Sequence, residues 1–274
     1  MEYLNTLGVA LYYDEFPDVV LNPSWISHGI YTIINYMQNS KIIKIHQDTI
    51  PSLFAGKDRR RYGHENCELL CKLMVKYELA FEVKDELNVL LVPAVLGEIN
   101  PSEMLKPNKD EETLARRYAF EIALSDSIFP RYIQRNHEHI KRRGDKSYIV
   151  GRGSISLEKN NTRANIIKEP RKVEITTWGE NKENFLNDLH NMFLELLNEH
   201  YLQWDRDEVK LPKEYVETGI LRELYDGGVS QIGGKDLQTI VNDYKLVENL
   251  SFIFKTGLNV DNPFGGIKNA IKRK

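Results

Sequence analysis

Residues 164–178 read Ala-Asn-Ile-Ile-Lys-Glu-Pro-Arg-Lys-Val-Glu-Ile-Thr-Thr-Trp, and this stretch decides the fold class. Ala164–Lys168 and Arg171–Trp178 each have the composition of a β-strand, and Glu169-Pro170 forms the break between them. A third strand-like run, Ser147–Leu157, precedes them. Strands joined by connections this short lie antiparallel, so the stretch predicts an antiparallel meander.

The flanking residues extend this sheet and cover it. Phe120, Ile122 and Leu124 recur at every second position, which predicts another half-buried strand. Helices are expected over about residues 127–142 and 182–201, where apolar side chains recur at helical spacing. Residues 115–204 should therefore form an α+β unit, in which helices cover one face of an antiparallel sheet.

Residues 1–97 have a different rhythm and predict a helix-rich unit. Leu4, Leu7 and Leu11 have helical spacing, and Asn22 followed by Pro23 is a helix start. A strand at Lys41–Ile45, a short helix from Asp48, a second long helix at His64–Glu78 and two strands joined around Lys84-Asp85-Glu86 follow. Helices followed by a hairpin give the outline of a winged-helix-like subdomain.

Two further segments complete the expected organisation. Residues 98–114 are polar and rich in turn residues, which predicts a linker. Residues 205–274 read as a C-terminal extension with short helices at Val216–Tyr225 and Lys235–Val241 and a mobile basic end. Met1 leads directly into the first apolar repeat, so we expect a fragment of a longer protein.

Composition excludes several classes of protein. The chain has 274 residues, of which 41% are hydrophobic and 28% charged, as in an ordinary globular protein. A net charge of −3 is too small for electrostatic capture of DNA or a membrane by the whole chain. Two cysteines cannot build a disulfide framework and suit a reducing compartment, so we expect a cytoplasmic protein.

The sequence contains no convincing catalytic or cofactor motif. Gly228–Asp236 approaches a P-loop, but an extra glycine displaces Lys235 and Asp236 replaces the magnesium-binding hydroxyl. Gly151-Arg152-Gly153 lacks a third glycine and reads as a bend within a strand. His137 and His139 are expected to be solvated, and Cys67 and Cys71 to be buried, inert thiols. We therefore expect no enzyme activity, cofactor or metal in this chain.

A nucleic-acid-binding function is the alternative that the winged-helix outline raises. Helix 64–78 would occupy the recognition position, but its polar residues are Glu65, Asn66, Glu68, Lys72, Lys76 and Glu78. This mixture of charges is poorly suited to phosphates. The basic loop Lys57–Arg61 is explained equally well as a solvated turn. Protein docking is therefore favoured, and a winged-helix nucleic-acid binder with a dimerisation domain remains the alternative.

Five stretches in order carry a family resemblance, and they cover about residues 7–201: Leu7–Tyr13 with Val19–Ile26, Leu73–Phe81, Leu90–Leu96, Ser127–Ile133, and Val173–Trp178 leading into Phe185–Leu197. They resemble the COR domain of Roco proteins, the region that follows the Roc GTPase domain. The tail, with Leu211-Pro212 and its glycine-rich turn, is similar to the extension in bacterial members. One departure is Val89, where the family often has a tyrosine that faces the GTPase domain.

The resemblance implies a function that spacing alone does not reveal. Residues 1–97 would be COR-A, which packs against Roc, and residues 115–204 would be COR-B, which carries most of the dimer contact. The chain would be the dimerisation and GTPase-coupling module of a Roco parent that also has leucine-rich repeats. GTP or GDP and magnesium are expected only in the Roc domain, which this chain lacks. Neither nucleic acid nor membrane is an expected partner.

Candidate contact residues follow from this assignment. The Roc-facing set comprises hairpin and basic-loop residues: Glu82, Val89, Leu90, Arg59, Arg60 and Arg61. The dimer-interface set comprises three aromatic residues of the second unit: Phe129, Tyr132 and Trp178. Phe129 and Tyr132 are expected to extend beyond the core stripe of their helix and reach a second copy.

Overall fold

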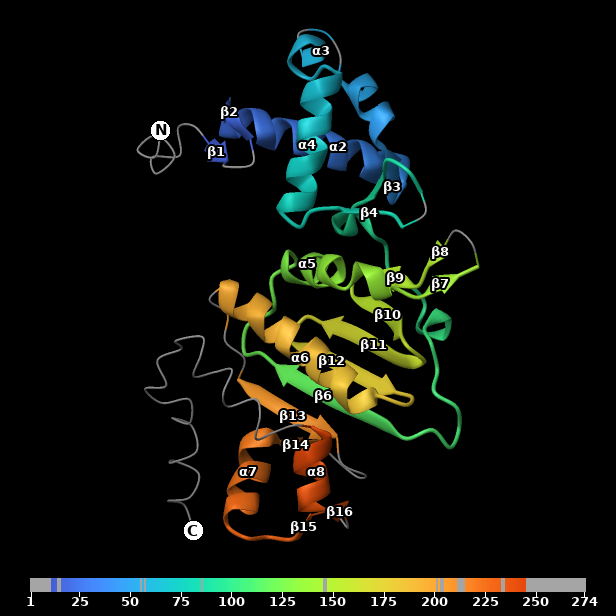
Figure 1. Ribbon diagram of the computed structural model, residues 1–274, viewed down its shortest axis with the longest axis vertical. Helices are drawn as coiled ribbons and strands as arrows, with labels where there is room; N and C mark the ends of the chain where they lie inside the picture. Colours follow the sequence, from blue (N-terminus) through green and yellow to red (C-terminus); the bar gives the residue numbers. More distant parts are fainter. Residues whose placement is uncertain are drawn as a thin grey trace. The chain divides into compact units, whose positions relative to one another are not determined.

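The computed structural model divides the chain into two compact units, Met1–Arg206 and Asp207–Lys274 (Figure 1). The described residues are 11–13, 16–54, 56, 58–84, 86–144, 147–200, 202, 205–210, 215–232 and 235–244. Of residues 11–21 and 59, only the backbone is described. The first unit contains both parts that the sequence predicts, a helical part and a sheet part.

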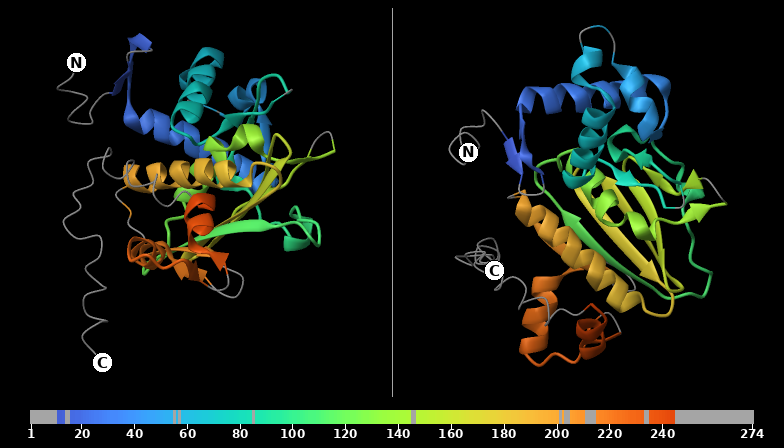
Figure 2. Two further views of the ribbon diagram at one scale, coloured as in Figure 1. Left: turned by 60° about the horizontal axis from the view of Figure 1, so that its bottom comes forward. Right: turned by 45° about the horizontal axis from the view of Figure 1, so that its top comes forward.

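Two crossing helices form the frame of the helical part (Figure 2). Helix α2 (Pro23–Ser40) begins where predicted, because the Asn22 side chain accepts a hydrogen bond from the Ser24 amide at 2.8 Å. Helix α4 (His64–Lys76) crosses α2 where Gly29 leaves room, since a Cβ at that position would lie 2.6 Å from Leu70 Cδ2. The absence of a side chain at Gly29 thus allows close helix packing.

A small antiparallel sheet closes the helical part. Its strands are β3 (Lys44–His46), β5 (Val89–Leu91) and β4 (Phe81–Glu82), in that spatial order. The predicted hairpin is confirmed, because Phe81 pairs with Leu91 and Glu82 with Leu90. Helix α2, strand β3, helix α4 and the β4–β5 hairpin follow one another in the predicted order. Assignment of this part to the winged-helix class stays a prediction.

Shorter elements fill the connections of this part. They are β1 (Leu11–Tyr13), β2 (Phe16–Leu21), the 3-10 turns η1 (Gln47–Leu53), η2 (Pro93–Val95) and η3 (Pro101–Glu103), and the one-turn helix α3 (Asp58–Arg61). Leu11 lies in an antiparallel pairing with Leu21, so the expected helix does not reach it. Leu4 and Leu7 lie outside the described residues.

The second part of this unit is the predicted antiparallel meander. Its strands run in the spatial order β6 (Thr113–Ala119), β12 (Lys172–Trp178), β11 (Thr162–Glu169), β10 (Ser154–Lys159) and β9 (Val150–Gly151). All four pairings between these neighbours are antiparallel. The α+β prediction is therefore confirmed.

Two helices cover one face of this sheet (Figure 1). Helix α6 (Lys182–Glu199) lies on β6, β11 and β12, and α5 (Ile128–Arg135) packs on α6. Apolar residues of alternating positions, including Ile166 and Ile175, are fully buried beneath α6. The Tyr132 hydroxyl donates to the Leu189 carbonyl at 2.7 Å and joins the two helices.

Three predicted boundaries in this part are wrong. Phe120–Leu124 is not a strand, because its amides bond to the turn at Pro170 and Arg171, and Ile122 is 82% exposed. Helix α5 ends at Arg135, and η4 (His137–His139), followed by β7 (Arg142–Arg143) and β8 (Ser147–Tyr148), continues the chain. Strand β6 begins at Thr113, inside the predicted linker.

Residues 97–104, here called the strap, pack tightly on the end of the sheet. The Arg152 amide donates to the Gly97 carbonyl at 2.7 Å. A Cβ at Gly151 would lie 2.9 Å from the Ile99 nitrogen, so only glycine fits beneath the strap. The Gly151-Arg152-Gly153 stretch is the predicted bend, and it forms the turn between β9 and β10.

The second unit holds two small hairpins and two helices. Its elements are β13 (Arg206–Lys210), β14 (Tyr215–Glu217), α7 (Thr218–Asp226), β15 (Gln231–Ile232), β16 (Lys235–Asp236) and α8 (Leu237–Asp243). Helix α8 begins two residues after the predicted start, because Asp236 caps it by accepting from the Thr239 amide at 2.9 Å. The basic end at residues 265–274 lies outside the described residues.

Candidate functional site

The tip of the β4–β5 hairpin projects an apolar side chain into solvent. We call residues 83–88 the wing. Leu87 at its tip is 84% exposed, and Asn88 supports the turn from a left-handed backbone, φ 56°. The Glu86 carboxylate accepts from the Lys44 ammonium at 2.5 Å and fixes the wing to β3. An exposed leucine held on a fixed turn is suited to contact with another protein.

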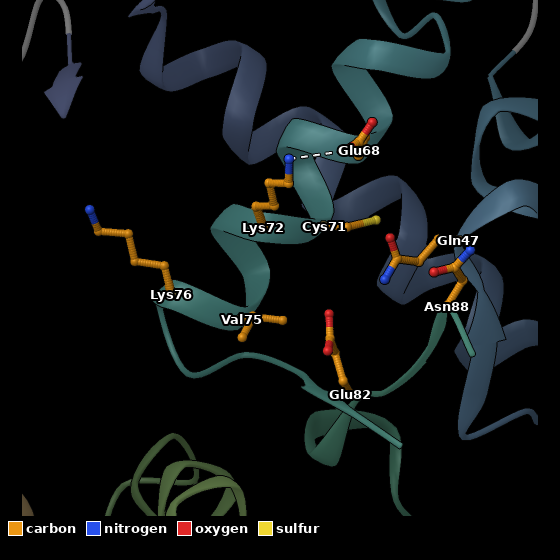
Figure 3. Close-up of a pocket in the computed structure, with 8 residues that line it drawn as sticks. All are labelled: Gln47, Glu68, Cys71, Lys72, Val75, Lys76, Glu82 and Asn88. Atoms are coloured by element: carbon orange, nitrogen blue, oxygen red, sulfur yellow. Dashed lines mark ion pairs between the residues drawn. The ribbon is translucent and has the colours of Figure 1, made fainter. Parts of the chain in front are cut away.

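A cavity of about 490 Å³ opens between the wing and α4 (Figure 3). Its lining is mostly polar: Gln47, Glu68, Cys71, Lys72, Val75, Lys76, Glu82 and Asn88. Lys72 pairs with Glu68 at 2.9 Å, and Glu82 points into the cavity from β4 (Figure 3). Since carboxylates and ammonium groups alternate along its wall, the cavity has no single sign of charge for a small ionic ligand.

The two thiols on α4 are buried, as predicted from their spacing. Burial raises the pKa of Cys67 to about 11 and that of Cys71 to about 12. The Cys67 Sγ donates to the Tyr62 carbonyl at 3.3 Å. Both groups therefore stay protonated near neutral pH, and a thiol in that state is a poor nucleophile.

The structure separates the six predicted Roc-facing residues into two groups. Glu82 is exposed and Val89 half-buried near the C-terminal end of α4, whereas Arg60 and Arg61 are exposed before its N-terminal end. The helix has 13 residues and is therefore about 20 Å long. The side chain of Arg59 is outside the description.

Leu90 requires a correction. It is fully buried in the core of the helical part, because it lies on the inner face of β5. A side chain with no exposed area makes no direct contact with a partner. The expectation that Leu90 faces Roc is therefore wrong, and the assignment of the other five residues stays a prediction.

The three predicted dimer residues also require a correction. Phe129, Tyr132 and Trp178 each have 0% exposure. Phe129 and Tyr132 lie on the side of α5 that packs into the core, where Tyr132 meets the Phe193 ring at 5.2 Å. Both residues belong to the core stripe and do not extend beyond it, so none of the three offers surface to a second copy.

A contact network between the helical part and the sheet part was not predicted. Arg135 of α5 binds Glu78 through Nε at 2.8 Å and Nη2 at 3.1 Å, and it also bonds Glu199 of α6. The Phe81 ring stacks on His137 at 4.9 Å. Glu78 and Arg135 are 57 positions apart, and no periodicity links such a pair in a sequence.

The wing makes a second contact with the sheet part. Arg142 donates to the Lys84 carbonyl at 2.6 Å, and its guanidinium lies over the Tyr148 ring. The Lys44 ammonium also lies 5.1 Å from the centre of that ring. These cation–π contacts tie β3 and the wing to the β7–β8 hairpin.

The described residues offer little to other functions. None of their His, Cys, Asp and Glu side chains form a group of three that could hold a metal ion. His137 and His139 are half-buried rather than solvated, because each contacts an aromatic ring. Helix α4 exposes both acidic and basic residues, so no observation favours nucleic acid. No helix within the described ranges is long and apolar enough to cross a membrane.

Comparison with protein families identifies the helical part and the sheet part of the first unit, and the second match continues to residue 217, in the second unit. A family model described as "C-terminal of Roc, COR-A domain" matches residues 1–96, and one described as "C-terminal of Roc, COR-B domain" matches residues 111–217. The two matches in this order define a COR domain. The chain belongs to the Roco family of proteins. A search of curated proteins returned no match.

Proposed function

We propose that this chain is the dimerisation and GTPase-coupling module of a Roco protein. COR-A would bind the Roc GTPase domain of the same parent, and COR-B would bind a second copy of the chain. The family membership supports this function, since COR domains occur beside Roc domains. GTP, GDP and magnesium would be bound by Roc in the cytoplasm, and this chain itself would catalyse no reaction.

The contact network between COR-A and COR-B is the observation that carries the coupling role. Rotation of a packed unit as a rigid body is one of the ways in which a protein transmits a change, and contacts between COR-A and COR-B favour such a motion. Arg135 joins Glu78 of COR-A to Glu199 of COR-B, and both Arg135 and Glu78 are less than one-quarter exposed. Bidentate pairing of partly buried groups is among the stronger polar contacts in proteins.

Self-association through COR-B is supported by apolar surface on its described part. Ile122 is 82% exposed in the loop before α5. A groove of about 740 Å³ beside this loop includes the apolar residues Ile99, Pro101, Met104, Leu124, Ile167 and Pro170 among its lining. Pairing of two copies about a two-fold axis would cover such surface.

The test uses the full 274-residue chain. Titration with the purified Roc domain of the parent protein should show saturable binding, and sedimentation velocity at tens of micromolar should show a dimer. A chain that neither binds Roc at about 100 µM nor associates with itself would contradict the proposed function. A shift on duplex DNA that weakens with salt would favour the nucleic-acid alternative instead.

A further inference from the structure

Helix α2 carries no charged residue along its whole length. Pro23–Ser40 contains no Asp, Glu, Lys or Arg, although a helix of 18 residues with the 28% charged composition of the chain would hold about five. Burial explains only part of this absence, because four residues of α2 are buried: Ile26, Gly29, Ile33 and Met37. The remaining side chains lack charge even where they face solvent.

The solvent-facing positions of α2 form a continuous uncharged surface. Residues at spacings of three and four are exposed along it: Ser24, Ser27, His28, Tyr31, Asn35 and Gln38. We call these six residues the α2 stripe. Tyr31 lies at its centre and is 66% exposed. Tyr36, on another side of α2, is 43% exposed.

The other long helices of the first unit show that this pattern is particular to α2. Helix α4 exposes Glu65, Glu68, Lys72 and Lys76, and α6 exposes Asp188, Glu195 and Glu199. Ordinary solvated faces in this protein therefore carry charge. The centres of protein–protein interfaces are depleted of charged residues and enriched in aromatic residues. The α2 stripe matches this in two respects: it contains no Asp, Glu, Lys or Arg, and the exposed Tyr31 lies at its centre.

The backbone beneath the stripe is held rigidly by aromatic contacts. The Tyr62 ring stacks between Trp25 at 5.3 Å and Phe54 at 4.0 Å, and its hydroxyl donates to the Trp25 carbonyl at 2.7 Å. Trp25 Nε1 in turn donates to the Arg61 carbonyl at 3.2 Å. A surface fixed in this way loses little conformational entropy when a partner binds.

The hydrogen bond from Trp25 to the Arg61 carbonyl holds two basic residues beside the α2 stripe. Arg60 and Arg61 of α3 are exposed, and α3 adjoins the N-terminal half of α2, where His28 lies 3.3 Å from Asp58. An uncharged centre with charged groups at its rim is the usual anatomy of a protein interface. The partner that matches this surface carries uncharged residues at its centre and carboxylates along the edge that meets α3.

We propose that the α2 stripe, with Arg60 and Arg61 at its edge, is the surface on which the Roc domain docks. This inference rests on the proposed function and places the contact on α2 rather than on the wing at the other end of α4. The family description places COR-A on the C-terminal side of Roc, so in the parent protein the polypeptide from Roc enters COR-A ahead of α2. Such a covalent connection raises the effective concentration of Roc beside COR-A.

The experiment compares two glutamate substitutions on the full chain. Tyr31→Glu places a charge at the centre of the stripe, and Leu87→Glu places the same charge at the wing tip, where the native side chain is also highly exposed. Purified GDP-loaded Roc domain is titrated calorimetrically onto each variant. Tyr31→Glu should raise Kd at least tenfold, as expected at the centre of an interface, and Leu87→Glu should leave it within about twofold. Arg60→Glu should weaken binding more at low salt than at high salt.

Each other outcome overturns the assignment. If Leu87→Glu weakens binding and Tyr31→Glu does not, Roc docks on the wing, and the proposed function survives while this inference fails. If the native chain itself does not bind Roc, the proposed function fails. If Tyr31→Glu changes only the sedimentation of the chain alone, the stripe is a contact between two copies. Matched thermal melts of the native chain and the three variants establish that all three variants are folded.

Discussion

Glu78 meets Arg135 from a left-handed backbone, φ 58°, one residue beyond the C-cap of α4. This conformation is uncommon for a residue with a side chain. It turns the chain out of α4 and towards β4, and it presents the carboxylate to α5 of COR-B. The end of one helix thereby becomes the attachment point for the other half of the unit.

Removal of this carboxylate should destabilise the chain. Glu78→Gln leaves the partly buried Arg135 without its bidentate partner, and we expect a loss of about 1–3 kcal/mol in the free energy of unfolding, measured in urea at pH 7. The control is Glu68→Gln, which breaks the exposed Glu68–Lys72 pair on α4 and should cause no measurable change. Equal effects of the two substitutions would contradict the role of Glu78.

Close packing of α2 on α4 should depend on Gly29. In Gly29→Ala the new methyl group would lie 2.6 Å from Leu70 Cδ2 and 2.8 Å from Tyr62 Cε1. Overpacking costs about 1–3 kcal/mol and outweighs the roughly 1 kcal/mol gain in helix propensity, so thermal melting should show a net loss of stability. Gly97→Ala, where nothing lies within 4 Å, is the matched control. Stabilisation by Gly29→Ala would refute this account.

The stability of COR-B should fall as the pH drops below about 6.5, the usual histidine value. Burial holds the pKa of His190 well below that value, with a smaller contribution from the charge of Arg116, and the imidazole bonds the Tyr118 hydroxyl. The unfolded chain therefore takes up the proton first, and stability declines by up to about 1.4 kcal/mol per pH unit down to the folded pKa. Above pH 6.5 this contribution is fully present.

Urea unfolding between pH 5 and pH 7.5 measures this dependence. His190→Gln should reduce the slope although it lowers stability overall. His139, whose pKa is also lowered by burial, contributes the part of the slope that remains. Glu158, whose pKa is lowered by its hydrogen bond to Lys141, loses its stabilising effect only below the usual range of carboxylates and does not interfere. An unchanged slope in His190→Gln would rule out the histidine as its source.

Substitution of the exposed Ile122 should weaken self-association directly, whereas substitution of a buried aromatic residue should act on the stability of the fold. Ile122→Asp changes an exposed side chain, so stability should stay within about 0.5 kcal/mol while sedimentation shows a shift towards monomer. Phe129→Ala should instead cost about 3–5 kcal/mol, because Phe129 is fully buried. A dimer that persists unchanged in Ile122→Asp would place the contact elsewhere.

Local patterns in the sequence were sufficient to predict the α+β fold. The caps at Asn22 and the turn at Glu169-Pro170 act between neighbouring residues, and the structure confirms the elements that they predict. The alternation of apolar residues at Phe120–Leu124 led to a wrong prediction of a strand. In the structure this segment bonds to the turn at Pro170 instead of to a neighbouring strand. Periodicity reports which residues are apolar and does not report which backbone groups will find partners.

The contact residues could be predicted only in part. Aromatic content pointed to Phe129 and Trp178 because large apolar side chains occur both in cores and in interfaces. Tertiary packing decides between the two, and here it buries both. The missing charge of α2 was readable in the sequence, but it gains meaning only when the structure shows which side of that helix faces solvent.

The strap over β9 has a consequence for where this protein can be divided. A fragment that begins at residue 98 would lack the Gly97 carbonyl, which accepts the Arg152 amide at 2.7 Å. The Arg152 amide, in the turn after the edge strand β9, would then lose its partner in the protein, and an edge strand whose cover is loosened invites pairing with other chains. Aggregation of such a fragment would reflect a misplaced cut rather than an unstable domain, and recombinant boundaries belong before the strap.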